Sequence, residues 1–154
     1  MTTIQIMEHG EQLTAGVREK VPMTELTGFF SRAFQDTMAA LQAQGVQPTG
    51  APFGKYYGPP GAVVDVEAGF PVAATIAPAG NVLPGTLPAG RVVEATHTGP
   101  YDTLADTYSE IQSYFMEAKL APEPVMWESY LSDPEVEPDP ATWRTAICWP
   151  VHGD

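Results

Sequence analysis

The sequence predicts an α+β fold in which antiparallel strands pack with two main helices. Three observations favour it: two segments with helical periodicity, strand-like stretches on either side of each, and a repeated order of strand, helix, strand and strand. The chain has 154 residues, 44% of them hydrophobic, which is enough for one domain with a sizeable core. We expect the two copies to be related by a pseudo-twofold axis with a central ligand groove.

The first helix is expected over about residues 24–44 and the second over about residues 101–118. Apolar residues recur in both segments at spacings of three or four, as on one face of a helix. Gly45 is expected to end the first helix, and Pro100 stands just before the second. The two stripes are Leu26, Phe30, Ala33, Phe34, Met38 and Leu41, and Leu104, Tyr108, Ile111 and Phe115.

Strand-like stretches flank both helices, and their apolar residues alternate with polar ones or glycine. They cover residues 13–21, 51–57, 62–72, 91–97, 124–131 and 142–151. Tyr56 of the first copy corresponds to Tyr130 of the second, and both copies close with an aromatic–Pro–Val tripeptide. We therefore expect one repeat over about residues 4–76, a Pro- and Gly-rich connector over about 77–90, and a second repeat over about 91–152.

The net charge of −12 arises from 19 acidic and 7 basic residues. Such a chain is not expected to bind nucleic acid through phosphates or to adhere to an anionic membrane. The one cysteine, Cys148, excludes an internal disulfide and is expected in a buried strand, whereas Asp65 and Glu67 are expected to face solvent. The histidines lack ligand spacing, so neither a metal site nor a cofactor is predicted. No signal peptide or membrane-spanning run is present, and a cytoplasmic location is expected.

Glu128 is the most informative residue because it lies in a stretch that otherwise reads as a buried strand. Alternation places Met126, Glu128 and Tyr130 on one face and Trp127 on the other. A carboxylate in apolar surroundings loses hydration energy unless a partner compensates. An exposed or salt-bridged glutamate is the ordinary alternative, whereas a ligand pocket would use this carboxylate to hold a cation.

Three runs of residues carry a family resemblance: His97–Leu104, beginning His-Thr-Gly-Pro-Tyr; Trp127–Pro134, beginning Trp-Glu-Ser-Tyr; and Thr145–Val151. Together they resemble the GyrI-like small-molecule-binding domain, which also forms the effector-binding half of many AraC- and MerR-type regulators. The resemblance covers nearly the whole chain. It implies a duplicated module that binds bulky, often cationic, aromatic compounds in its groove. In multidrug-sensing members, a glutamate at the position of Glu128 is the acidic anchor.

The regulators carry a DNA-binding helix-turn-helix in front of this domain. Here the first strand is expected near Ile4, so we expect a stand-alone domain. The segment His97–Tyr101 is expected to be a strand-to-helix turn rather than a catalytic group. Ordinary core packing is the alternative for every aromatic residue in the expected ligand-binding set. That set consists of Glu128, Tyr130, Tyr56, Tyr108, Trp149, Met126, Phe53 and Tyr101.

Three functions remain open from the sequence. The first is a small-molecule-binding protein, monomeric or dimeric, that senses or sequesters bulky aromatic cations. The second, implied by the resemblance, is a hydrolase of reactive cyclopropane-containing natural products in which Glu128 is catalytic and orients or deprotonates a water. The third, also implied by the resemblance, is a protein-interaction module that protects DNA gyrase from toxins, acting through an acidic outer face.

Overall fold

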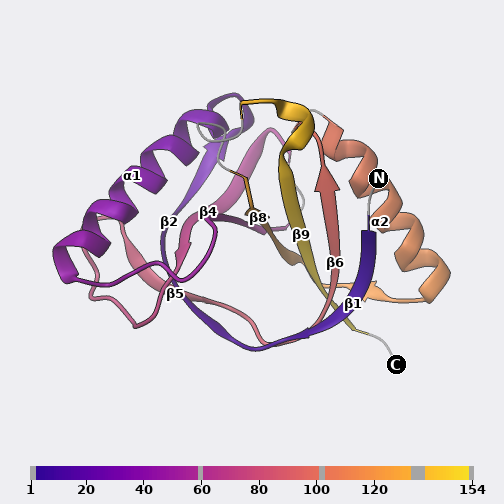
Figure 1. Ribbon diagram of the computed structural model, residues 1–154, viewed down its shortest axis with the longest axis horizontal. Coiled ribbons are helices and arrows are strands. Elements are labelled where there is room, and N and C mark those ends of the chain that lie inside the picture. The colour runs from indigo at the N-terminus through magenta and orange to yellow at the C-terminus, as the bar shows by residue number, and fades with distance from the viewer. Residues whose placement is uncertain (1–2, 59–60, 101–102, 133–137, 153–154) are drawn as a thin grey trace. The chain divides into compact units, whose positions relative to one another are not determined.

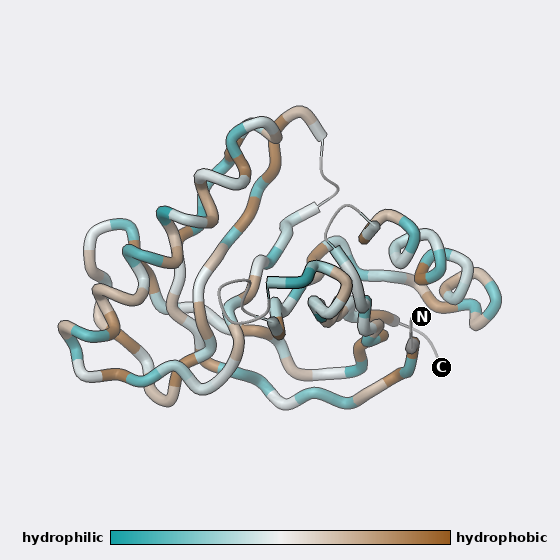
Figure 2. The backbone as a smooth tube through the Cα atoms, turned by 45° about the horizontal axis from the view of Figure 1, so that its top comes forward, coloured by the Kyte–Doolittle hydropathy of each residue, from teal (hydrophilic) through white to brown (hydrophobic). Residues whose placement is uncertain are grey.

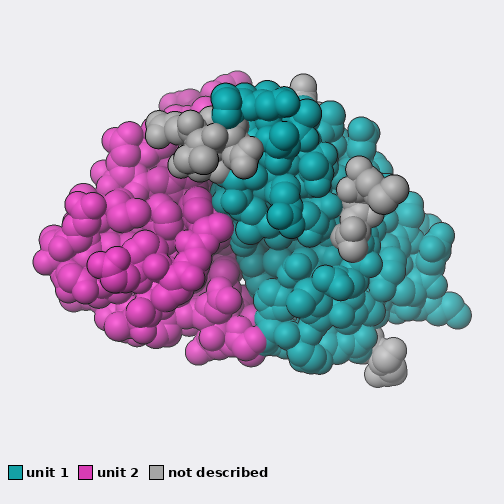
Figure 3. Space-filling model, viewed as in Figure 1, with its two compact units in different colours: residues 1–9, 90–154 teal, residues 10–89 magenta. Residues whose placement is uncertain are grey.

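A computed structural model describes residues 3–58, 61–100, 103–132 and 138–152 (Figure 1). The described residues form a mixed α+β fold with two α-helices and antiparallel strands, which confirms the predicted fold class. Contacts divide the chain into two compact units (Figure 3). Unit 2 is Gly10–Ala89, and unit 1 joins Met1–His9 to Gly90–Asp154.

Unit 2 contains one helix and four strands in the order β3-β4-β2-β5, all paired antiparallel. Its α-helix packs against β2 and β4. A short 3-10 helix, Met23–Glu25, leads into it. The elements are β2 (Gln12–Pro22), α1 (Leu26–Gln44), β3 (Phe53–Tyr57), β4 (Val63–Pro71) and β5 (Leu83–Leu87).

Helix α1 is amphipathic, with hydrophobic and hydrophilic residues alternating along its turns (Figure 2). Its most buried residues are Phe29, Ala33, Thr37, Ala40 and Leu41. The predicted stripe therefore needs a correction of about one residue, because Phe30 and Phe34 lie at the edge of the packed face and are only partly buried. The predicted end at Gly45 is confirmed, since this residue has a left-handed φ of 68° that favours glycine.

Unit 1 contains the second helix and the strands β1-β6-β9-β8, with the short strand β7 paired to β9. Thr107, Ile111 and Phe115 are the buried residues of its helix, which packs against β6. A 3-10 turn, Pro140–Thr142, precedes the last strand. The elements are β1 (Thr3–His9), β6 (Gly90–Thr98), α2 (Leu104–Ala118), β7 (Ala121–Pro122), β8 (Val125–Tyr130) and β9 (Arg144–His152).

The segment that the sequence predicts as a connector contains a strand, β5, which pairs with β2. Pro84 and Gly85 within it are poor strand formers, so the local pattern hides the strand. Pairing with β2 on one side places these residues at the edge of the sheet in unit 2, where a proline is tolerated. Composition alone was therefore a misleading guide to this segment.

Lys119 ends helix α2 with a left-handed φ of 56°, and it is the one non-glycine residue with positive φ among those described. A side chain in this conformation costs about 1–2 kcal/mol, whereas glycine loses about 0.5–1 kcal/mol of unfolded-state entropy. We expect Lys119→Gly to raise the free energy of unfolding by about 0.5–1 kcal/mol in urea denaturation. Lys119→Ala removes the same charge and keeps the Cβ, so a glycine variant no more stable than the alanine variant would contradict this account.

Candidate functional site

Glu128 lies in β8 with only 6% of its surface exposed. Strand pairing sets its direction: Glu128 is opposite Ile147 of β9, and the preceding Trp127 is opposite Cys148. Because successive side chains of a strand point to opposite faces, Glu128 and Trp127 lie on different faces of the sheet. The predicted separation of these two residues is therefore confirmed, and Met126 is also buried.

Two tyrosine hydroxyls hold the Glu128 carboxylate. Tyr130, two residues along β8, donates to Oε1 at 2.9 Å. Tyr108 of α2 donates to Oε2, and its hydroxyl also lies 3.9 Å from Sδ of Met126. Four residues that the sequence singles out thus come together within unit 1, where the hydroxyl of Tyr108 links helix α2 to strand β8. Each carboxylate oxygen accepts one strong hydrogen bond.

Burial raises the pKa of Glu128 above its ordinary value of 4.5. The hydroxyl hydrogen bonds from Tyr108 and Tyr130, and then the charge of His97, act in the opposite direction without cancelling the effect of burial. The protein therefore disfavours the ionised carboxylate while nothing positive is bound beside it. A cation placed against Glu128 would reverse this preference.

An aromatic group adjoins the carboxylate. The ring of Trp149 meets that of Tyr108 edge to face, with centroids 6.2 Å apart and planes at 75°. It meets Phe115 in the same manner at 5.3 Å. The indole N–H of Trp149 donates to the backbone carbonyl of Glu123 at 2.8 Å, which fixes the ring. These contacts hold the ring of Trp149 against that of Tyr108, whose hydroxyl donates to the Glu128 carboxylate.

His97 is a buried polar residue, and its role was not predicted from the spacing of residues in the sequence. Its Nδ1 lies 2.6 Å from the hydroxyl of Thr107, and its Nε2 lies 2.9 Å from the hydroxyl of Thr103. Nε2 also lies 3.1 Å from the carbonyl of Pro100. These contacts tie the end of β6 to the start of α2, the helix that carries Tyr108. The predicted strand-to-helix turn is confirmed as far as the described residues extend, and its histidine braces it.

The remaining predicted ligand-binding residues are Tyr56, Phe53 and Tyr101. Tyr56 and Phe53 belong to β3 in unit 2, where Tyr56 is partly buried against the unit's core and Phe53 is fully buried. Tyr101 lies outside the described residues. The other five members of the predicted set all belong to unit 1: Glu128, Tyr130, Tyr108, Met126 and Trp149.

Unit 2 has its own charged network, which corrects one expectation. Glu67 is buried rather than facing solvent, because it accepts a 2.6 Å hydrogen bond from the hydroxyl of Tyr57. Asp65 is partly buried and makes a bidentate pair with Arg18, with both N···O distances 3.0 Å. The guanidinium of Arg18 stacks 3.6 Å from the centre of the Tyr57 ring. The strand alternation was right, but polar partners on neighbouring strands bury Glu67 and partly bury Asp65.

Comparisons with known proteins identify a family and several structures that the chain resembles. The family model of the GyrI-like small molecule binding domain matches residues 2–152. No curated protein matches the chain. Within the described residues, no helix is long and apolar enough to cross a membrane.

Three solved structures share the fold. The crystal structure of the EcmrR C-terminal domain has a TM-score of 0.87 and 22% identity, covering 100% of this chain and 99% of that one. EcmrR in a DNA complex has a TM-score of 0.88 and 23% identity; the match covers 99% of this chain but 58% of EcmrR, so this chain spans little more than half of that protein. SAV2435 bound to tetraphenylphosphonium has a TM-score of 0.72 and 15% identity, covering 98% of this chain and 94% of that one.

Proposed function

The chain belongs to the GyrI-like small-molecule-binding domain family, and from this premise we propose that it binds bulky aromatic cations through the carboxylate of Glu128. The observation that carries the proposal is the buried carboxylate held by two tyrosine hydroxyls in unit 1. A relative of the same fold, SAV2435, has been solved with a lipophilic cation, tetraphenylphosphonium. Sensing or sequestering such compounds in the cytoplasm is part of the proposal.

Selectivity for cations would come from electrostatic attraction to the poorly hydrated carboxylate of Glu128. An ionised carboxylate away from water attracts a cation far more strongly than one at the surface. The ring faces of Tyr108 and Trp149 add a cation–π contribution, and the flexible thioether of Met126 adapts to ligand shape. A neutral aromatic ligand gains the ring contacts alone. Because Glu128 is only 6% exposed, side chains around it must move for a ligand to reach the carboxylate.

The test is a tryptophan-fluorescence titration with tetraphenylphosphonium and with triphenylphosphine oxide, a neutral compound of related shape. Trp149 reports directly, since its ring contacts Tyr108. We expect Glu128→Gln to weaken cation binding tenfold or more, because the substitution removes the charge and keeps the size. Binding of the neutral compound should change little.

Glu117→Gln is the matched control. Glu117 is exposed on α2 and its substitution changes the net charge by the same amount, so it separates local attraction from the field of an acidic protein. Equal weakening of both ligands by Glu128→Gln, or equal weakening of the cation by both variants, would refute the proposal. If neither compound binds, a narrow-specificity hydrolase becomes the better account. For cyclopropane-containing compounds, a mass gain of one water on incubation would identify it.

A further inference from the structure

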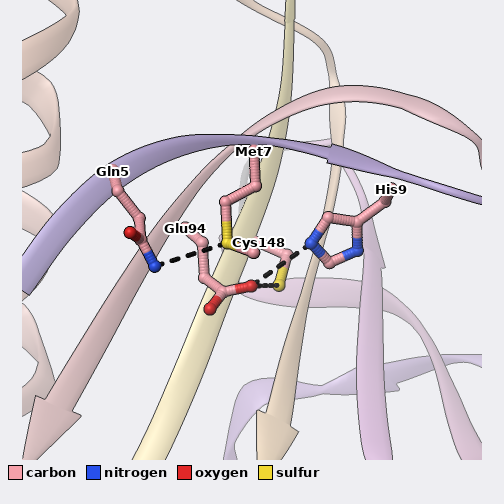
Figure 4. A network of polar contacts seen from close by, with 5 residues as sticks. All are labelled: Gln5, Met7, His9, Glu94 and Cys148. Carbon is pink, nitrogen blue, oxygen red and sulfur yellow. Dashed lines mark hydrogen bonds and ion pairs between the residues drawn. The ribbon is translucent and has the colours of Figure 1, made fainter.

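A second group of side chains gathers on strands β1, β6 and β9 of unit 1 (Figure 4). Nε2 of His9 lies 3.2 Å from Oε2 of Glu94. The thiol of Cys148 donates to the same oxygen at 3.8 Å. The three ligand atoms all lie within 4.8 Å of one another.

Strand register brings these three residues together. Glu94 of β6 is opposite Cys148 of β9 and opposite Gln5 of β1. His9 follows Gln5 by an even number of residues on β1, so its side chain emerges on the same face. The ring of His9 is held edge-on against Trp127 of β8, with centroids 6.2 Å apart and planes at 69°. Four neighbouring strands thus define the position of the cluster.

We propose that His9, Glu94 and Cys148 form a site for a transition-metal dication of the zinc class. Imidazole nitrogen, carboxylate oxygen and thiolate sulfur are the three donor types that Zn²⁺ uses in proteins. A thiolate and a carboxylate together balance the charge of a dication, while the imidazole binds as a neutral ligand. Three protein ligands leave the fourth tetrahedral position for water or another small ligand.

The observed spacing is close to what such an ion requires. Bonds of about 2.0–2.3 Å at tetrahedral angles place ligand atoms about 3.3–3.7 Å apart. The 3.2 Å and 3.8 Å separations already bracket this range, and the remaining pair needs a movement of at most about 1.5 Å. The side chains of His9 and Glu94 are each 21% exposed, so an ion can reach the cluster from their side.

A reactive cysteine is the competing explanation for this cluster. Cys148 is only 3% exposed, so dissolved electrophiles and oxidants have little access to its thiol. Reactive and redox-sensing cysteines are solvent-accessible, and this one is not. The cluster is also separate from Glu128, because Trp127 and Glu128 lie on opposite faces of β8. The metal-site proposal therefore does not rest on the proposed ligand-binding function.

The test is titration of the purified full chain with Co²⁺, followed by displacement with Zn²⁺. Bound Co²⁺ in a tetrahedral site with a thiolate gives a sulfur-to-metal charge-transfer band and intense visible absorption. We expect one equivalent per chain with both signals, and their loss when Zn²⁺ is added. Cys148→Ser should abolish the charge-transfer band, and His9→Ala should weaken binding at least tenfold.

Glu8→Gln is the control for diffuse attraction to an acidic chain, because Glu8 is exposed on β1 and points to the opposite face from His9. Its spectrum and affinity should match those of the wild type, as should those of Glu128→Gln. His9 is only partly buried, so His9→Ala is expected to fold even if the cysteine variant does not. A wild-type spectrum without a thiolate band, or an affinity unchanged in the folded His9→Ala protein, would overturn the proposal.

Discussion

Binding of a lipophilic cation should weaken about tenfold for each pH unit below the pKa of Glu128. Burial raises that pKa, so the weakening begins above the ordinary carboxyl value of 4.5. The cation binds the ionised carboxylate, and protonation removes the attractive charge and leaves a neutral acid among apolar groups. The measurement is the dissociation constant of tetraphenylphosphonium from neutral pH down to 4.5.

Glu128→Gln separates this effect from other titrating groups. The groups that face the carboxylate are Tyr108, Tyr130 and His97, and all three remain in the variant. Any pH dependence due to His97 therefore appears in both proteins, and the difference between them belongs to Glu128. A wild-type affinity as flat with pH as that of the variant would show that the carboxylate does not hold the cation.

The stability of the ligand-free protein should have the opposite pH dependence: it should fall as the pH rises, whereas cation binding strengthens. The folded state holds the Glu128 proton more tightly than the unfolded state, since the folded pKa is the higher of the two. The stabilising contribution is fully present below the unfolded pKa and is lost as the pH rises through the folded pKa. Glu128→Gln lacks this loss, so its stability relative to the wild type should increase across that window. A cation that binds Glu128 in the folded protein should offset this loss.

Sequence patterns were sufficient to predict the local part of the site, within one strand or one helix. Period-two alternation correctly placed Met126, Glu128 and Tyr130 on one face of β8, and helical spacing placed Tyr108 in the stripe of α2. These are short-range patterns, which depend on the geometry of one strand or one helix. That Tyr108 would reach Glu128 depends on the packing of α2, which spacing alone does not specify.

Contacts distant in sequence were not predictable from spacing. His9 is 85 residues from Glu94, and Cys148 is 54 residues from it, so no ligand motif exists along the chain. Their proximity depends on the pairing of β1 with β6 and of β6 with β9. Glu67 was misplaced for the same reason: its hydrogen-bond partner, Tyr57, is on another strand. A charged residue gives no sign in the sequence of which neighbour will bury it.

Gly69→Ala should destabilise the protein by at least about 3 kcal/mol and prevent unit 2 from folding normally. Gly69 of β4 is paired with Gly16 of β2. A Cβ at Gly69 would lie 2.6 Å from the Cα of Gly16 and closer still to the carbonyl oxygen of Ala15. Both obstructing atoms belong to the backbone, so no side-chain rotation can relieve the overlap. Circular dichroism and urea denaturation measure the loss.

The size of this effect follows from what the glycine pair holds together. Strand β2 lies between β4 and β5, and α1 packs on both β2 and β4, so separating the two strands disturbs the whole of unit 2. At Gly10, an added Cβ meets nothing within 4 Å, and Gly10→Ala should change stability by no more than about 0.5 kcal/mol. If Gly69→Ala proved as stable as Gly10→Ala, the close approach of β2 and β4 would be wrong. The register that buries Ala15, Val17 and Ala68 would then need to shift.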